Sequence, residues 1–529
     1  MCRLATSHTR YCSCFRLFWL RISLVQVKTQ LDDLQNYLTD ASNMPGGHAE
    51  KLFVPENEQE IAELLSEANE KKIPVTISGA RTGTVGGAVP FGGWVISLEK
   101  LNKIKSIDKE DLRAVVEPGV ILGDFQKAVD AEGLFYPPDP TEWSCQIGGT
   151  VATNASGARS FKYGATRRFV TGLRIVLPNG ERLVLKRGSA ITSEAGPIEL
   201  TTENGNKITA KTPTYERPNV RKNVSGFFNE RPLDAIDLFI GSEGTLGVIT
   251  EIELSLLPKP EGFFSGIVFF RKDDDLLGFV DKVKRTSFSV REPIAGNVAD
   301  VGVRVSLDAT LIEYFDDRAL KFISEKFPET PSGMAGAIFF EQETTAENED
   351  ELFEAWNRLL EKHNADVDVS WFTTTEQDLE KMRAFRHALP VSVNERVVRN
   401  KQKKIGTDMA VPDEAFPGFL RFYKDTLDAS GIDYVIFGHI GDCHLHANLL
   451  PKDEVEAERS RHLYGRFIAQ AVMLGGTVSA EHGIGKLKSK YLNVMMGERY
   501  LNEMAELKRA FDPNGILGRG NMFSPDLLK

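Results

Sequence analysis

The sequence predicts an α+β fold with two sheet-containing parts and a mostly helical C-terminal segment. Three observations lead to this prediction. Short strand-like runs with few helices between them occur along residues 46–256, a Leu-Pro-Lys-Pro motif interrupts the chain at residues 257–260, and strands alternate with helices after it. Because 529 residues exceed what one simple core usually holds, we expect two or three packed units.

The first part is expected to contain an amphipathic helix over residues 58–71, because Ile61, Leu64, Leu65 and Ala68 recur at helical spacing. Shorter helices are expected at residues 30–38 and 122–132. The predicted strands of this part are residues 74–77, 94–98, 114–116, 170–177, 182–185 and 248–256.

Paired prolines interrupt both helices and sheets, so a domain boundary is expected at residue 258. The elements predicted after it are strands at residues 263–270, 310–314 and 337–342 and helices ending near residues 284 and 362. From residue 454 the chain is expected to be mostly helical and to fold back at its turn-rich end. The predicted units are residues 1–45 (a basic extension and a helix), 46–258, 259–453 and 454–529.

The overall charge is acidic, with 64 basic and 75 acidic residues and a net charge of −11. Such a balance disfavours nucleic-acid binding. Of the five cysteines, Cys145 and Cys443 lie far apart in the globular part, and no CxxC motif occurs in the chain. We therefore expect a reduced, cytosolic protein without an iron–sulfur relay.

Residues 1–31 carry five basic residues and no acid. Arg16 and Arg21 interrupt the apolar run of residues 14–27, which is shorter than the ~20 apolar residues of a membrane helix, so no transmembrane segment is predicted. The extension is interpreted either as a transit peptide or peripheral anchor or as the product of a spurious start codon. Peripheral membrane association and mitochondrial import remain the alternatives to the cytosol.

Three segments rich in glycine and small residues occur in the first part, at residues 78–87, 147–157 and 241–250. Glycine exposes backbone N–H groups and permits close approach, so such loops can surround an anion such as a pyrophosphate or press against a flat ligand. A flexible hairpin is the alternative for any one of them. Neither GxGxxG nor GxxxxGK[ST] occurs, which argues against Rossmann and P-loop folds.

Together with Pro137, Pro138, Asp139 and Pro140, these segments resemble the FAD domain of vanillyl-alcohol-oxidase-type flavoproteins over residues 50–258. The resemblance implies a two-part FAD-binding domain followed by an α+β substrate (cap) domain. It implies that FAD is bound by Ser78, Gly79, Ala80, Arg81, Thr82, Gly83, Thr84, Pro138, Ile147, Gly148, Gly149, Thr150, Asn154, Ser156, Gly157, Gly244, Ile249 and Asn521. Some relatives bind flavin covalently through a histidine in the first loop. Because Arg81 and Thr82 stand there, we expect noncovalent FAD.

A second cluster lies at residues 438–450 and contains His439, His444 and His446. Glycines at 438 and 441 disfavour a helix, so a strand, a tight turn and a second strand are predicted. Alternation along the strand would place His444, His446 and Asn448 on one face, and the turn would bring His439 beside His446. A buried histidine that merely packs in the core is the alternative for each of them.

Glu481 and His482 stand in a third segment, residues 479–492. Two neutral imidazoles and a carboxylate can hold Zn²⁺ or a similar divalent ion such as Mn²⁺ and leave a position open for substrate. The predicted metal ligands are His439, His446 and Glu481. His482 is expected to point away from Glu481 if the backbone is extended, and so to be free to act as a base.

These segments and residues 512–523 resemble the C-terminal half of FAD-linked dehydrogenases for D-lactate, glycolate and D-2-hydroxyglutarate. The resemblance implies a metal site at His439, His446 and Glu481, substrate contact by Asn448 and a catalytic base at His482. Relatives commonly carry Gly-Asn where this chain has Cys443 and His444, which leaves open whether His444 is a ligand.

A 2-hydroxy acid needs a cation for its carboxylate, preferably a guanidinium. Arg386 matches the family's carboxylate-binding arginine, with a surface arginine as the alternative. Four residues further on, Pro390 replaces the threonine of the hydroxyglutarate enzymes. Lys404 belongs to a basic run over residues 396–404 and is the member expected nearest to the site.

The predicted function is FAD-dependent oxidation of a D-2-hydroxy acid to the 2-oxo acid, assisted by a metal. His482, Arg386, Asn448 and Lys404 are the expected catalytic and substrate-binding residues. The alternatives are a metal-dependent hydrolase and an alkylglycerone-phosphate-synthase-like flavoenzyme. The expected partners are the substrate and an external acceptor, which is a quinone, an electron-transfer flavoprotein or a cytochrome. Nucleic-acid binding is not expected. The sequence leaves open whether the protein forms a homodimer.

Overall fold

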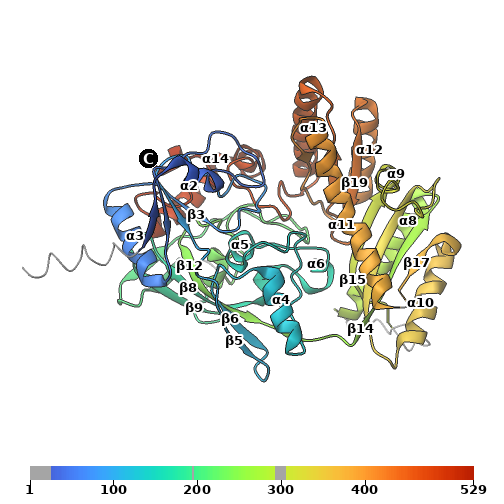
Figure 1. Cartoon of the computed structure of the whole chain (residues 1–529), viewed down its shortest axis with the longest axis horizontal. Coiled ribbons are helices and arrows are strands. Elements are labelled where there is room, and N and C mark those ends of the chain that lie inside the picture. The colour runs from blue at the N-terminus through green and yellow to red at the C-terminus, as the bar shows by residue number, and fades with distance from the viewer. Residues whose placement is uncertain (1–24, 193–195, 292–305, 374) are drawn as a thin grey trace, which may run out of the picture.

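The computed structural model describes residues 25–192, 196–291, 306–373 and 375–529. Most of the N-terminal extension analysed above, residues 1–24, lies outside the described residues. Figure 1 shows two halves beside each other, one built from the blue and green residues before Pro258 and the other from the yellow and orange residues after it. The red C-terminal end lies next to the blue N-terminal elements.

A small sheet of four strands begins the first half, in the order β1-β2-β4-β3. Its strands are β1 (Gln26–Lys28), β2 (Lys51–Val54), β3 (Val75–Ser78) and β4 (Trp94–Ser97). Strand β4 pairs in parallel with both β2 and β3, which helix α3 (Glu58–Glu70) connects. The Asn57 side chain caps this helix, and its predicted apolar stripe is buried in the core. The helix predicted at residues 30–38 is split into α2 (Leu31–Leu34) and a 3₁₀ turn, η2 (Gln35–Tyr37).

A second, antiparallel sheet of five strands completes the first half, in the order β5-β6-β12-β8-β9. Its strands are β5 (Ile104–Asp108), β6 (Arg113–Val116), β8 (Val170–Val176), β9 (Arg182–Lys186) and β12 (Val248–Ser255). The helices that lie between β6 and β8 in the chain are α4 (Leu122–Ala131), α5 (Ile147–Thr153) and α6 (Ser160–Tyr163). The glycine-rich segment at residues 147–157 therefore begins with a short helix.

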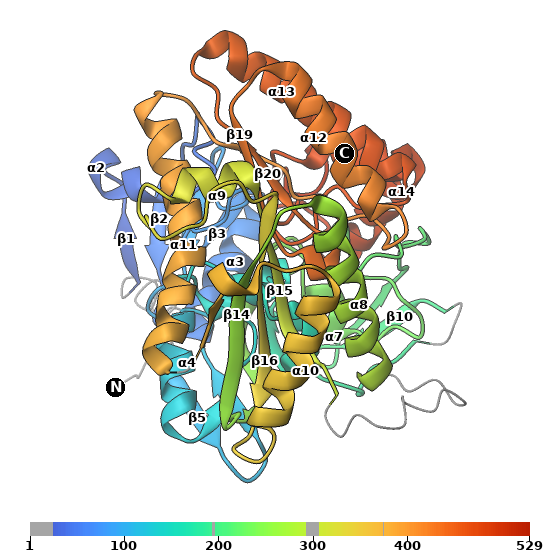
Figure 2. The ribbon, with the colours of Figure 1, turned by 90° about the vertical axis from the view of Figure 1, so that its right-hand side faces the viewer.

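The second half is organised around an antiparallel sheet of seven strands, in the order β17-β14-β16-β15-β19-β20-β18. Its strands are β14 (Gly262–Phe270), β15 (Ala309–Asp316), β16 (Gly336–Thr344), β17 (Trp371–Phe372), β18 (Ile405–Gly406), β19 (Tyr434–Gly438) and β20 (His446–Leu449). Figure 2 shows helices on the face turned away from the first half: α8 (Asp273–Arg291), α9 (Asp317–Ile323), α10 (Glu349–Lys362) and α11 (Glu376–Arg399).

Strand β15 lies in the middle of this sheet, and all eight of its residues are buried. Helix α6 of the first half packs against it. The two halves thus meet at β15, and a charged side chain on this strand, such as Glu313, must find its partners inside the protein.

The connection between the halves corrects one expectation. The Leu-Pro-Lys-Pro motif does not exclude sheet structure, because β13 (Leu257–Pro258) pairs with β7 (Leu134–Phe135). Proline is tolerated there because this ladder has only two strands, so both of them are edge strands.

The C-terminal segment contains α13 (Glu454–Met473) and α14 (Ser489–Phe511), and α12 (Phe416–Ser430) precedes it. The chain then returns to the first half, as predicted. The backbone N–H of Val75 donates to Ile516 O at 2.8 Å, and that of Gly518 donates to Val75 O at 3.1 Å. Among the helices that the structure describes, none is both long enough and apolar enough to cross a membrane.

Candidate functional site

A cavity of about 370 Å³ lies where the three glycine-rich segments meet, and its volume falls in the range of small-molecule sites. The loop after β3, helix α5 and the segment before β12 all contribute to its lining. Glu481 and His482 from the C-terminal half also line it. Segments separated by hundreds of residues therefore form one site.

The glycines of this cavity have two different tasks. A Cβ at Gly148 would lie 2.5 Å from Pro118 Cβ, so only glycine allows α5 to pack this closely. A Cβ at Gly83, Gly149 or Gly244 would meet no atom within 4 Å. These three positions leave the space open and keep backbone groups accessible to a ligand.

Most of the residues expected to bind FAD line this cavity. Those that do are Gly79, Ala80, Arg81, Thr82, Gly83, Thr84, Gly148, Gly149, Thr150, Ser156, Gly244, Ile249 and Asn521. Those that do not line it are Ser78, Pro138, Ile147, Asn154 and Gly157. Of the latter, Ser78 and Ile147 are fully buried, and Pro138 O accepts a hydrogen bond from Gln126.

Glu243 fastens the Glu481–His482 loop to the cavity, and sequence reasoning did not single it out. Its carboxylate accepts hydrogen bonds from Ile484 N at 2.6 Å and Gly485 N at 2.7 Å. Burial raises the pKa of Glu243, although both backbone donors oppose the shift. Asn521 ties the C-terminal segment to the same region by donating to Gly87 O and to Glu243 O.

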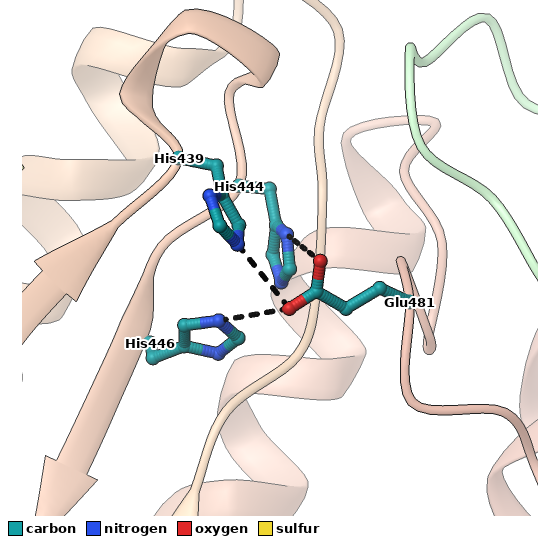
Figure 3. Close-up of side chains that lie close together, drawn as sticks. All are labelled: His439, His444, His446 and Glu481. Atoms are coloured by element: carbon teal, nitrogen blue, oxygen red, sulfur yellow. Dashed lines mark hydrogen bonds and ion pairs between the residues drawn. The ribbon is translucent and has the colours of Figure 1, made fainter. Parts of the chain in front are cut away.

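The predicted metal ligands come together at one carboxylate oxygen (Figure 3). His439 Nε2 lies 3.3 Å and His446 Nε2 lies 3.2 Å from Glu481 Oε1. Two ligand atoms at bonds of about 2 Å in a tetrahedral site are about 3.3 Å apart, so the spacing suits a small divalent ion. The predicted strand, turn and strand produce this geometry: His439 follows β19, and His446 begins β20.

Both imidazoles have their second nitrogen engaged, as metal-binding histidines usually do. His439 Nδ1 lies 2.5 Å from Glu313 Oε1, and His446 Nδ1 lies 2.9 Å from Thr407 O. Burial alone would lower the pKa of His439, but the Glu313 and Glu481 carboxylates together outweigh it and raise that pKa to about 9. In turn, His439 and Arg386 lower the pKa of Glu313 to about 2, against the effect of burial.

His444 belongs to the same cluster but is oriented differently (Figure 3). Its Nδ1 lies 3.9 Å from Glu481 Oε2, the oxygen that the other two histidines do not approach. Its Nε2 lies 3.1 Å from Asp408 Oδ1. Burial lowers the pKa of His444 to about 3, so this imidazole is neutral. The four potential ligand atoms of His439, His444, His446 and Glu481 lie within 4.8 Å of one another.

The expectation that His482 points away from Glu481 is wrong. Its Nε2 lies 3.8 Å from Glu481 Oε1, and its ring stacks on His446 with the centroids 5.2 Å apart. The backbone bends at these residues instead of running extended, so neighbouring side chains share one side. Desolvation lowers the pKa of His482 to about 4, which keeps the imidazole neutral and able to accept a proton.

Arg386 lies beside the cluster, on α11. Its Nε lies 3.2 Å from Glu313 Oε2, and its Nη1 donates to Thr141 Oγ1 at 2.9 Å. Thr141 lines the cavity, so this guanidinium joins the imidazole cluster to the cavity wall. Glu313 was missed from the sequence, although an acid within the apolar run of residues 309–315 was a usable signal.

Asn448 and Lys404 lie next to each other across Gly406. A Cβ at Gly406 would be 2.8 Å from Asn448 Oδ1 and 3.2 Å from Lys404 Cε. Asn448 is fully buried, and its Oδ1 has no hydrogen-bond partner among the described residues. Desolvation lowers the pKa of Lys404. Neither residue lines the cavity of the first half.

Models of known protein families match both halves of the chain. The family model "FAD binding domain" matches residues 49–186, and "FAD linked oxidases, C-terminal domain" matches residues 295–522. Glycolate oxidase subunit GlcD of Bacillus subtilis is 31% identical over 500 residues, which cover 93% of each chain. A D-lactate dehydrogenase of Anaerostipes hadrus is 32% identical over 482 residues, which cover 89% of each chain.

Among solved structures, p-cresol methylhydroxylase superimposes with a TM-score of 0.68 at 16% identity, covering 97% of each chain. This likeness shows the fold, which is of the vanillyl-alcohol-oxidase type. The domain match also removes the interpretation in which the glycine-rich half is only structural. The chain belongs to the FAD-linked oxidases, in the family that contains glycolate oxidase subunits and D-lactate dehydrogenases, and it is an FAD-linked oxidoreductase.

Proposed function

We propose that this protein oxidises a D-2-hydroxy acid of the D-lactate, glycolate or D-2-hydroxyglutarate class to the corresponding 2-oxo acid. One observation carries the proposal: Glu481 and His482 line the cavity of the FAD half and at the same time belong to the imidazole cluster of the second half. A substrate held by that cluster therefore lies at the wall of the flavin site.

FAD suits the cavity because the glycine positions leave open space there and the lining residues match the FAD-domain segments. When bound, FAD supplies a two-electron acceptor for the hydride of the substrate Cα. We propose that it is held noncovalently, because Arg81 and Thr82 occupy the loop position from which some relatives form a covalent bond. Acid precipitation should then release all the yellow colour into the supernatant.

A divalent metal, Zn²⁺ or Mn²⁺, suits His439, His446 and Glu481, whose ligand atoms have the spacing of a metal site. When bound, the ion supplies positive charge that lowers the pKa of the substrate hydroxyl. Glu313 and the carbonyl of Thr407 hold the two imidazoles in the orientation that directs Nε2 towards the ion.

The chain's own side chains then have defined tasks. His482, neutral because its pKa is low, accepts the hydroxyl proton at Nε2 while the Cα hydride leaves. Arg386 binds the substrate carboxylate, and Asn448 and Lys404 fix the rest of the molecule. The C–O bond becomes a carbonyl, and the product is the 2-oxo acid.

Each oxidation of substrate leaves two electrons on the enzyme, and these must pass to an acceptor before the next turnover. The part of the chain that the structure describes has two cysteines, Cys145 and Cys443, fewer than the four thiolates that usually hold an iron–sulfur cluster. We propose that an external acceptor, a quinone, an electron-transfer flavoprotein or a cytochrome, reoxidises the enzyme.

An anaerobic titration tests the proposal directly. The purified yellow protein is mixed with paired D- and L-isomers of lactate and 2-hydroxyglutarate and with glycolate, and the flavin absorbance is followed. Bleaching by one of the D-acids or by glycolate is the expected result. Because Pro390 offers no hydroxyl, we expect the smaller acids to act faster than D-2-hydroxyglutarate. Failure of every hydroxy acid would contradict the proposal and favour a synthase-like flavoenzyme.

A further inference from the structure

A second cavity, of about 280 Å³, lies behind the candidate metal site. It is bounded by the residues around α6 and by the loop at residues 217–230. Ser156 lines both this cavity and the flavin cavity, and Ala480, the neighbour of Glu481, lines the second one. The two cavities therefore lie back to back, with Glu481 between them. We call the second one the Arg168 cavity.

The lining of the Arg168 cavity is strongly cationic. It includes five basic residues, and its only acid is Glu230, whose side chain is 64% exposed. Arg217 is paired with Glu230 at 3.0 Å, and Arg221 with Asp413 at 3.1 Å. Arg168 is exposed, and within the described part of the chain it has no carboxylate partner; the one hydrogen bond of its side chain is a long one, 3.4 Å to Tyr163 O. Arg167 is likewise paired with Asp237 at 2.9 Å and Lys222 with Glu481 at 3.0 Å, so among the described residues Arg168 is the one basic residue of the lining that no carboxylate pairs with.

An unused hydrogen-bond donor also lies at this cavity. Asn223 lines it, and the Oδ1 of its side chain accepts from Ser225 N and Thr477 Oγ1, which fixes the orientation of the amide. The Nδ2 atom is buried and has no acceptor among the described residues. A buried donor without a partner destabilises the protein. An acceptor supplied by a ligand would remove that cost.

The Arg168 cavity is joined to the metal site through Lys222. This lysine lines the cavity with only 3% of its side chain exposed, and its Nζ lies 3.0 Å from Glu481 Oε2. Ser156 Oγ donates to the same oxygen at 3.2 Å. This oxygen, Oε2, is the one that His439 and His446 do not approach. A negative charge in the cavity would compete with Glu481 for Lys222.

We propose that the Arg168 cavity is a binding site for a small oxyanion, a carboxylate or a phosphate, held by Arg168 and the Asn223 amide. Its charge excludes cations, and its volume excludes polymers. The proposal goes beyond hydroxy-acid oxidation, since anion binding here needs no redox chemistry. Two sources share this chemistry: a 2-oxo acid released from the adjacent site, and inorganic phosphate from solution.

Isothermal titration calorimetry on the flavin-loaded protein tests the site. Sodium phosphate and sodium pyruvate are titrated separately at constant ionic strength, with sodium chloride as the blank. The background is Arg386→Gln, which weakens binding of the same anions at the substrate site. We expect a saturable heat that weakens at least about tenfold when Arg168→Gln or Asn223→Leu is added. Arg285→Gln, a solvent-exposed arginine on α8, is the matched control and should change nothing.

Each outcome decides the proposal. Weakening by both cavity variants supports it, and the tighter of the two anions identifies the source. Equal binding before and after Arg168→Gln, or a heat no larger than that of chloride, overturns it. The calorimetry measures anion binding and not flavin bleaching. Its result therefore does not depend on whether any hydroxy acid bleaches the flavin.

Discussion

Asp408 Oδ2 lies 3.5 Å from His482 Nδ1 and accepts a hydrogen bond from the backbone N–H of the same histidine at 3.1 Å. The other carboxylate oxygen accepts from Glu481 N at 3.2 Å. One fully buried aspartate therefore orients both the proposed base and the proposed metal ligand. By facing Nδ1, it leaves Nε2 of His482 as the nitrogen that accepts a proton, in the manner of the carboxylate in a catalytic triad.

Replacing this carboxylate should impair the reaction without removing the flavin. Asp408→Asn keeps the shape but weakens the acceptor for His482 Nδ1, so we expect flavin reduction by substrate to slow about 10–100-fold at saturation, with little change in KM. Stopped-flow absorbance measures both. Asp413→Asn, an acid on the same segment with a side chain 46% exposed, is the control. A changed KM with an unchanged rate at saturation would contradict the orienting role.

His482→Asn tests the base itself. Since a positioned general base typically contributes about 10²–10⁴-fold, we expect the rate of flavin reduction to fall by that factor. The flavin should stay bound, so the protein remains yellow. His462→Asn, whose side chain is 78% exposed on α13, is the matched control. Wild-type reduction kinetics in His482→Asn would remove this histidine from the mechanism.

We expect the three histidines around the proposed metal site to differ in their importance for metal binding. His439→Ala and His446→Ala each remove a nitrogen that converges on Glu481 Oε1, so we expect loss of the metal and more than about 100-fold slower flavin reduction. His444→Ala should retain the metal, because its Nε2 is paired with Asp408 and its Nδ1 approaches the other oxygen.

Metal content per bound flavin, measured by elemental analysis, distinguishes the three variants. Chelator treatment of the wild type should reproduce the defect of His439→Ala, and added Zn²⁺ or Mn²⁺ should reverse it. Loss of the metal in His444→Ala would show that this third imidazole is a ligand. Wild-type protein that is free of metal yet fully active would contradict the site altogether.

The sequence predicted those parts of the site that depend on local chemistry. Glycines at residues 78–87 and 147–157 indicate open space or close packing, and the predicted strand, turn and strand bring His439 beside His446. The resemblance then joined these segments into one site. The sequence did not predict helix α5, because its glycines have a low helix propensity. In the folded protein, packing against Pro118 overrides that preference.

The supporting residues could not be predicted because nothing local marks them. Glu313 lies 126 positions before His439, and Lys222 lies 259 positions before Glu481. Each is a single charged residue in an otherwise ordinary stretch, and its role comes only from the tertiary contact. Asp408 is similar, since it stands in a strand-like segment without a motif. An isolated charge inside an apolar run is the one signal that such residues give in advance.

A final prediction concerns stability and lies outside the active site. Asp316 caps α9 through a 2.7 Å hydrogen bond from Ala319 N to Oδ1, while its Oδ2 is buried without a partner among the described residues. Burial raises the pKa of Asp316 from 3.8 to about 7, with Asp317 adding to the shift and Lys424 opposing it. The folded protein therefore binds this proton more tightly than the unfolded chain, and the contribution of Asp316 to stability falls as the pH rises from about 4 to about 7.

Asp316→Asn keeps an oxygen that can cap α9 and cannot ionise. The variant should therefore lose no stability through this side chain as the pH rises. The difference in unfolding free energy between the variant and the wild type should shift in favour of the variant by up to about 4 kcal/mol between pH 4 and pH 8. Comparing this difference across pH cancels any constant cost of the new amide. Urea unfolding at pH 4, 5, 6, 7 and 8 provides the measurement, with Glu325→Gln, a change at an exposed acid just after α9, as the control. A pH-independent difference would mean that Asp316 keeps an ordinary pKa in the folded protein.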